Sequence, residues 1–567
     1  MAERPAELTY SLDERPPWQK CLLVAAQHVA VICPTLVIVA IIAHGAGESG
    51  ETSRHAMARA LIAVALMTVF QAIRFRGIGS GYFLPPVVTA TYLPASLSAG
   101  AMGGPALVAG MTIFGGVVQM LFSRTIRVLR KVFPAVVSGV ILMAVAMELC
   151  QIGMGVVFDP VLVVRHDFSR VASVALATLL PIVVFGVWGR GLCRLLCALI
   201  GIIVGYGAAA VAGLFTTADL SRIAALPAVQ LPSFAGISFA FSQDVLVVFL
   251  IAAMANGLRA VGVLTTCQQL NDASWKRSDI PRTQGGVLAD GLGCAVCGLM
   301  GTAASAASPS LVGLQKATGV TSRVIAWYVA GLCVVLACLP MPLMVLVQMP
   351  KPVMGAALFF NGAMMFVAGL QVALSRPLTL RGHIVIGFSV MLGVGVLVFP
   401  EFFHKMPPLV RQLTNSPIAI AVVSAVGLNL FFLLGRWRYS SARFEVKEGD
   451  PRAFLEREAK LWKIPEADLH RIVAVVGDVL STIHPCLHEG SSIDMKAGFD
   501  GYDVKVQFSY TGTLPALVTN RRPPRGELVE EQSFAAGLSG YLSGVQADRV
   551  DAGNSGDRCK ILLLFNL

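Results

Sequence analysis

The stretch GIGSGYFLPPVVTATYLP occupies residues 77–94 of a chain that is otherwise built from long apolar runs. Its prolines, Pro85, Pro86 and Pro94, and the β-branched residues between them disfavour one continuous helix. A bilayer tolerates non-helical backbone only where protein or a water-filled cavity encloses it. We therefore predict a short extended piece followed by a half-helix, enclosed at bilayer depth.

A second interrupted stretch, GTAASAASPSLVG, occupies residues 301–313 and is broken by Pro309. Counting apolar runs, the two stretches belong to the third and tenth of about fourteen segments, so each is third in its half of seven. Interrupted spans at matching positions of two halves point to the midplane site of a transporter. We expect their half-helix N-termini to face a bound solute, with two ordinary kinked helices or re-entrant packing elements as the alternative.

Composition supports a membrane protein, because 55% of the 567 residues are hydrophobic, only 14% are charged, and the mean hydropathy is +0.72. Soluble proteins carry roughly 25% charged residues. We predict a cytoplasmic segment at 1–19, an all-α transporter domain at 20–440, and a cytoplasmic α+β domain at 445–567. The predicted spans are about 20–43, 58–73, 80–97, 104–123, 133–155, 171–188, 192–215, 243–268, 284–301, 305–317, 322–345, 351–374, 380–399 and 416–435.

The distribution of Lys and Arg predicts the orientation of these spans. With the N-terminus inside, the inner loops hold fifteen Lys and Arg residues and the outer connections hold eight. Positive residues accumulate on the cytoplasmic side, so we expect both termini in the cytoplasm and the chain in the inner (plasma) membrane. The net charge of +11 is then explained by orientation and requires no nucleic-acid partner. The twelve cysteines show no paired spacing, and we predict no disulfide framework, metal site or cofactor.

Polar residues inside spans are costly and suggest function. His28 is a candidate for binding solute or carrying a proton, or else a neutral side chain bonded to a neighbouring helix. Arg259 lies in mid-span beside Asn256, and we expect it to pair with a carboxylate, Asp290 being the nearest candidate, or with an anionic substrate. Asp290 is alternatively a helix-start cap.

The chain also carries a set of short motifs, which are Gln27-His28, Gly79-Ser80-Gly81-Tyr82, Ala289-Asp290-Gly291, Gly301-Thr302, Val312-Gly313-Leu314, Thr318-Gly319 and Thr321-Ser322-Arg323. Together they resemble the nucleobase–ascorbate transporters, a family that includes uracil, xanthine and urate permeases. The run at 265–277 is similar to one bacterial subgroup. The resemblance spans residues 15–440.

This resemblance implies fourteen spans in two inverted repeats of seven, core and gate domains, and a homodimer. It also implies a small-molecule substrate between spans three and ten, contacted by span eight and moved with H⁺ or Na⁺. The implied ion-coupling residues are His28 and Asp290. The substrate-binding residues it implies are His28, Thr89, Tyr92, Ala255, Asn256, Arg259, Ser308, Pro309 and Ser310.

Some positions depart from the family pattern. Ser310 and Leu311 stand where the family has Gln or Glu followed by Asn, while Ala255 and Arg259 replace acidic or His positions of span eight. The pocket has thus exchanged a negative group for a positive one, which predicts an altered, anionic substrate, either a urate- or xanthinate-like base or another organic anion. An anion transporter of the same fold and a solute sensor signalling through the C-terminal domain are the alternatives. None of these is an enzyme.

The predicted elements of the C-terminal domain are a helix at 467–483, strands at 502–510 and 560–565, and a Gly-containing stretch before a helix at 536–542. In this order they resemble the ATPase domain of anti-sigma-factor serine kinases. Asp478 and Thr482 stand where that family has Glu and a metal-binding Asn, and Tyr510-Thr511-Gly512 replaces its Asp-x-Gly loop. We therefore expect a degenerate, non-catalytic domain that regulates the transporter or binds a cytoplasmic protein partner, with an active ATPase as the alternative.

Overall fold

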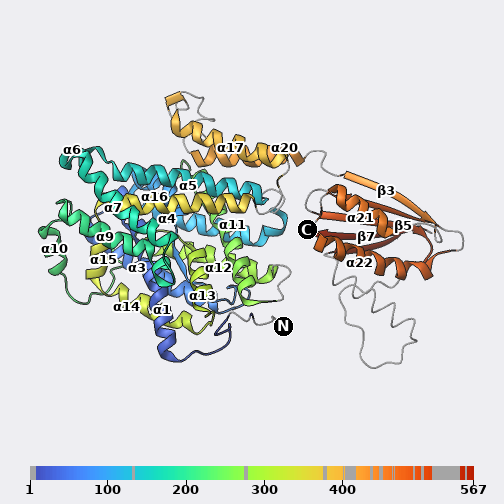
Figure 1. Cartoon of the computed structure of the whole chain (residues 1–567), viewed down its shortest axis with the longest axis horizontal. Coiled ribbons are helices and arrows are strands. Elements are labelled where there is room, and N and C mark those ends of the chain that lie inside the picture. The colour runs from blue at the N-terminus through green and yellow to red at the C-terminus, as the bar shows by residue number, and fades with distance from the viewer. Residues whose placement is uncertain are drawn as a thin grey trace. The chain divides into compact units, whose positions relative to one another are not determined.

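The structure is a computed structural model, and it divides the chain into two compact units, Met1–Asn429 and Leu430–Leu567. The first unit is almost entirely helical and the second is a small α+β domain (Figure 1). The residues it describes are 5, 8–129, 134–273, 279–374, 378, 380–399, 401–402, 417–433, 438–445, 451–462, 464, 466–488, 492–499, 503–513, 549–555 and 558–566.

The first unit is a bundle of mostly apolar helices. In chain order its elements are α1 (Trp18–Ile32), η1 (Cys33–Leu36), α2 (Val37–Gly45), α3 (Gly50–Ala72), β1 (Pro86–Val88), η2 (Ala90–Tyr92), α4 (Leu93–Leu129), α5 (Ala135–Val157), α6 (Pro160–His166), α7 (Phe168–Val187), α8 (Leu192–Leu195), α9 (Cys197–Val211), α10 (Thr217–Ala224), α11 (Leu246–Asn271), α12 (Ile280–Leu299), β2 (Ser305–Ala307), α13 (Pro309–Thr318), α14 (Ile325–Ala337), α15 (Pro340–Val347), α16 (Lys351–Ala373), α17 (Leu380–Val398) and α20 (Pro417–Leu433).

Eight helical stretches among the described residues are long and apolar enough to cross a bilayer. They are Trp18–Gly45, Gly50–Ala72, Ala90–Thr125, Ala135–His166, Phe168–Val187, Leu246–Asn271, Lys351–Ala373 and Leu380–Val398. The pair α14 and α15, bent by 77°, makes a ninth if it is counted as one span. The chain is therefore a multi-pass integral membrane protein.

Helix α4 consists of two helices that meet at a break. Gly103 has φ −143° and Gly104 has φ +64°, and Pro105 begins the second helix. A residue with a side chain adopts the backbone conformation of Gly104 only with strain, so glycine at this position allows the chain to turn. The sequence predicted a boundary between residues 97 and 104, and the break lies at its C-terminal end.

The two interrupted stretches pair with each other at the heads of two helices. Strand β1 lies antiparallel to β2, with Pro86 opposite Ala307 and Val88 opposite Ser305. The Thr89 N–H extends the pairing by donating to the carbonyl of Ala304 over 2.9 Å. Each strand is followed by helix, η2 and α4 after β1 and α13 after β2. The extended pieces predicted from the prolines are thus present, and they satisfy each other's backbone groups.

Glycines bring two pairs of antiparallel helices into backbone contact. On α5 and α16, which lie side by side in Figure 1, a Cβ added to Gly139 would lie 2.6 Å from the Gly369 carbonyl oxygen, and one added to Gly355 would lie 2.5 Å from that of Gly153. The second half of α4 meets α12 in the same way, because a Cβ on Gly116 would lie 2.7 Å from the Gly291 carbonyl. Small residues permit this close approach of helices in a membrane.

The second unit is a five-stranded antiparallel sheet packed against helices. Its elements are β3 (Arg438–Glu445), α21 (Pro451–Trp462), α22 (Glu466–Ile483), η3 (His484–Cys486), β4 (Ser492–Phe499), β5 (Asp503–Thr511), β6 (Arg549–Ser555) and β7 (Arg558–Asn566). The strand order is β3-β4-β5-β7-β6. The predicted helix and both predicted strands are present as α22, β5 and β7, and the predicted stretch at 536–542 lies outside the described residues.

Candidate functional site

Asp290 is the centre of a buried polar network beneath the strand pair. It lies in the middle of α12, so the alternative that it caps a helix start is wrong. Its carboxylate accepts hydrogen bonds from the backbone N–H of Ala307 at 2.8 Å, from Gln119 Nε2 at 2.7 Å and from Asn256 Nδ2 at 3.2 Å. A buried carboxylate needs such donors, and here they join α12 to β2, α4 and α11.

Asn256 links this hydrogen-bond network to Thr89, the residue after β1. Its Nδ2 also donates to Gln119 Oε1 at 3.1 Å, and its Oδ1 accepts a long hydrogen bond of 3.5 Å from the Thr89 hydroxyl. Arg259, three residues further along α11, donates from Nη1 to the same hydroxyl at 3.2 Å. Asn256 and Arg259 therefore both contact Thr89, the residue that follows β1.

Arg259 does not form the predicted ion pair with Asp290 in the described part of the chain. The Asp290 oxygens accept from amide groups, while the guanidinium binds Thr89 and remains partly exposed. A polar network without a direct salt bridge keeps Asp290 in place and leaves guanidinium N–H groups available to a further acceptor.

The start of α13 forms the accessible part of this region. Pro309 and Ser310 are exposed, whereas Ser308 is buried with an exposed fraction of 4%. The Ser308 side chain makes no capping hydrogen bond to the helix. The first N–H groups of a helix lack intrahelical partners and favour negative groups, so this end can bind an acceptor on a solute.

The remaining predicted residues lie deeper in the packing. His28 donates from Nδ1 to the Val24 carbonyl of its own helix, at 2.8 Å, and its ring centroid lies 4.8 Å from that of Phe83. Its Nε2 is buried and has no hydrogen-bond partner among the described residues. Tyr92 is fully buried between Phe249 and Gly115. Ala255 is also fully buried and contributes no polar group.

Sequence reasoning missed Gln119 and Cys294, which belong to the same network. Gln119 bonds both Asp290 and Asn256, and the Cys294 thiol donates to the Ser305 carbonyl at 3.0 Å. Gln119 is a lone amide in an apolar span, and this signal was available from the sequence. Over the described ranges, no group of three or more His, Cys, Asp or Glu side chains could hold a metal ion.

The predicted nucleotide-handling positions of the second unit make local contacts. The Thr482 hydroxyl donates to the Asp478 carbonyl one helical turn earlier, at 2.8 Å. The carbonyl of Gly512 accepts from the Cys559 thiol at 3.2 Å. These contacts hold the end of α22 and the end of β5, and the role of the domain stays a prediction.

Comparison with known proteins agrees with the arrangement of the first unit. The model of the permease family Xan_ur_permease matches residues 19–402. The chain is 25% identical to xanthine permease XanP and 26% identical to xanthine permease XanQ, both of Escherichia coli K12, over 75% of its length and 95% and 94% of theirs. It is 24% identical to uric acid permease PucJ of Bacillus subtilis, over 73% of this chain and 93% of that one. The chain belongs to this permease family, whose members are membrane transporters.

Proposed function

We propose that the protein is a secondary transporter for a purine base of the xanthine or uric acid type, coupled to H⁺ or Na⁺. The observation that supports this most directly is the antiparallel pair β1–β2, which heads two helices and lies over the Asp290–Asn256–Gln119 network. The relatives that this chain matches over 93–95% of their own length are xanthine and uric acid permeases. A purine edge presents both N–H donors and carbonyl acceptors, and amide and hydroxyl groups can pair with both.

The proposed architecture has fourteen spans in two inverted repeats of seven. Supporting features are the two strand-headed helices, each third in its half, and the antiparallel backbone contacts of α5 with α16 and of α4 with α12. On this proposal α5 and α16 belong to a gate domain and the strand pair to a core domain. Both termini are then cytoplasmic, the membrane is the inner (plasma) membrane, and the assembly is a homodimer.

In this proposal the solute binds at the exposed start of α13 and beside Arg259. Thr89, Asn256 and Ser308 then position the site, and Ser310 offers a hydroxyl to the solute. Asp290 and His28 are the proposed ion-coupling groups. Tyr92 and Ala255, both fully buried, then act by packing behind the solute.

A related anion transporter is the second candidate, and one observation favours it. Arg259 has no ion pair among the described residues, and its helix α11 contacts α13, whose exposed N-terminal end also favours negative groups. In this case the solute is an inorganic or organic anion. A transporter-derived sensor, signalling to a cytoplasmic partner through the C-terminal domain, is the third candidate.

Uptake into proteoliposomes tests these candidates. We expect saturable uptake of labelled xanthine or uric acid that a protonophore or removal of Na⁺ abolishes. Flux of sulfate, bicarbonate or chloride without base uptake would favour the anion transporter. Tight binding of a base without any flux would favour the sensor.

A further inference from the structure

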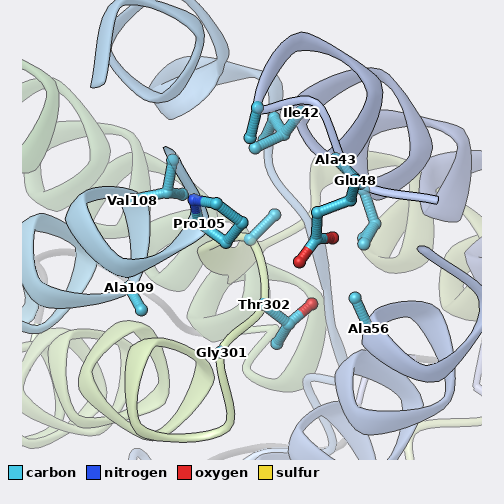
Figure 2. A pocket seen from close by; sticks show the side chains of 12 residues that line it. Ile42, Ala43, Glu48, Ala56, Pro105, Val108, Ala109, Gly301 and Thr302 are labelled. Carbon is cyan, nitrogen blue, oxygen red and sulfur yellow. The ribbon is translucent and has the colours of Figure 1, made fainter. Parts of the chain in front are cut away.

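A pocket whose lining does not include Arg259 lies where the end of α2, the start of α3, the second half of α4 and the turn after α12 meet (Figure 2). Its volume is about 330 Å³, including the part open to solvent. Its walls are mostly apolar, with Val39, Ile42 and Val108 among them. Pockets for small organic ligands are typically apolar with a few placed polar groups.

Two polar side chains line this pocket. The Glu48 carboxylate points into it, and the Thr302 hydroxyl lies on the opposite wall (Figure 2). Thr302 has an exposed fraction of only 4%, and its buried Oγ1 makes no hydrogen bond within the described residues. A buried hydroxyl without a partner costs about 1–3 kcal/mol, so a ligand that bonds it gains affinity.

Arg59 does not line the pocket, but it binds the turn that carries Thr302. It is 4% exposed and donates from Nη1 to the Ser233 carbonyl at 2.8 Å and from Nη2 to the Gly301 carbonyl at 3.2 Å. These bonds hold the turn that presents Thr302. The positive charge of Arg59 also favours the ionised form of Glu48, although burial is the larger influence and raises the pKa of Glu48.

The pocket is continuous in sequence with the strand pair. Ala303 lines it, and the carbonyl of the next residue, Ala304, accepts the Thr89 N–H. A solute in the pocket is therefore next to the backbone that carries β2. On the proposed topology, this end of α2, α3 and α12 faces the outside of the cell.

We propose that this pocket is an outer subsite at which the base docks before it reaches the central site. A ring N–H donates to Glu48, the Thr302 hydroxyl donates to the adjacent ring carbonyl, and the apolar walls contact the ring faces. The carboxylate and the hydroxyl together thus recognise the adjacent N–H and carbonyl of the ring. Position 255, where the family has an acid, is an alanine in this chain and cannot supply the carboxylate. This inference rests on the proposed function, because it takes the same purine substrate.

Sided transport measurements test the subsite. Labelled xanthine is supplied to right-side-out vesicles and to inside-out vesicles that contain the wild type, Glu48→Gln or Thr302→Val. For both variants we expect KM to rise about tenfold from the outside, the effect of one lost charged or neutral hydrogen bond, and to stay unchanged from the inside. Glu51→Gln is the matched control, because that exposed carboxylate pairs with Arg54 and does not line the pocket.

Thr302→Ser keeps the hydroxyl, so we expect it to retain the wild-type KM from the outside, which separates loss of the hydroxyl from misfolding. An unchanged outside KM in Glu48→Gln and Thr302→Val, or an equal rise from both sides, would overturn the subsite. A wild-type protein that takes up no purine from either side would instead reject the proposed function itself.

Discussion

Arg259 and Thr89 are 170 residues apart in the chain, and their side chains are joined by a hydrogen bond of 3.2 Å. The bond links the middle of α11 to the residue that follows β1. Because Thr89 also donates to Asn256, its hydroxyl connects the guanidinium to the Asp290 network. A substitution of Arg259 is therefore expected to alter the candidate solute site more than the packing of the helices.

We predict that Arg259→Ala weakens binding of an anionic or polar solute by roughly 100-fold and lowers the melting temperature only slightly. The lost term is a charge-assisted hydrogen bond to the solute, worth about 1.5–3 kcal/mol. Binding is measured by isothermal calorimetry on protein in detergent, and stability by thermal unfolding. Arg76→Ala, on a loop at the protein surface, is the control. An unaltered dissociation constant for Arg259→Ala would remove the electrostatic part of the proposal.

Asp290→Asn is predicted to disrupt the strand pair. The amide keeps one acceptor oxygen and places an NH2 donor where the other carboxylate oxygen accepted from Ala307 or Gln119. At least one buried donor then lacks an acceptor, at a cost of about 1–3 kcal/mol. We expect a lower melting temperature together with loss of uptake. Asp244→Asn, on the exposed loop before α11, serves for comparison. If Asp290→Asn melts like the wild type, the network does not stabilise the site.

A larger side chain in the seam between α5 and α16 is predicted to destabilise the first unit. In Gly139→Val the new Cβ would lie 2.5 Å from the Ala373 methyl group and 2.6 Å from the Gly369 carbonyl oxygen. Overpacking of this kind costs about 1–3 kcal/mol. Gly395→Val on α17, where an added Cβ meets nothing within 4 Å, should be tolerated. Equal melting temperatures of the two variants would contradict the contact.

The ionisation of Glu48 is predicted to make the melting temperature of the protein depend on pH. Burial raises the pKa of Glu48 in the folded chain, so its contribution to stability is greatest when it is protonated and is lost as the pH rises through that pKa. Glu48→Gln stays neutral at every pH. Its melting temperature should therefore match the wild type near about pH 4 and exceed it near about pH 7. A wild type that is the more stable of the two at neutral pH would show that the charge of Arg59 outweighs burial.

Local sequence predicted the features that depend on backbone chemistry. Pro85 and Pro86 indicated the extended piece before α4, and the pair Gly103–Gly104 before Pro105 marks the break that divides α4. Each of these signals acts within a few residues, because it restricts or frees the backbone of the residue that carries it.

Partners between distant segments were harder to predict. The pairing of Arg259 with Thr89 instead of Asp290 depends on the rotation of α11 relative to β1, which no local pattern encodes. Asp290 was assigned a possible capping role because Ala289-Asp290-Gly291 is ambiguous without knowledge of where α12 begins. Glu48 was overlooked because it lies in a connection between spans, where an acidic residue is ordinarily solvated.

The glycine seam of α5 and α16 has a consequence for inhibition. At Gly139, Gly153, Gly355 and Gly369 backbone lies against backbone, so no side-chain gap is left there for a lipid tail or a hydrophobic drug to wedge the two helices apart. Ligand discovery is therefore better directed at a pocket, such as the one that Glu48 and Thr302 line, than at this seam.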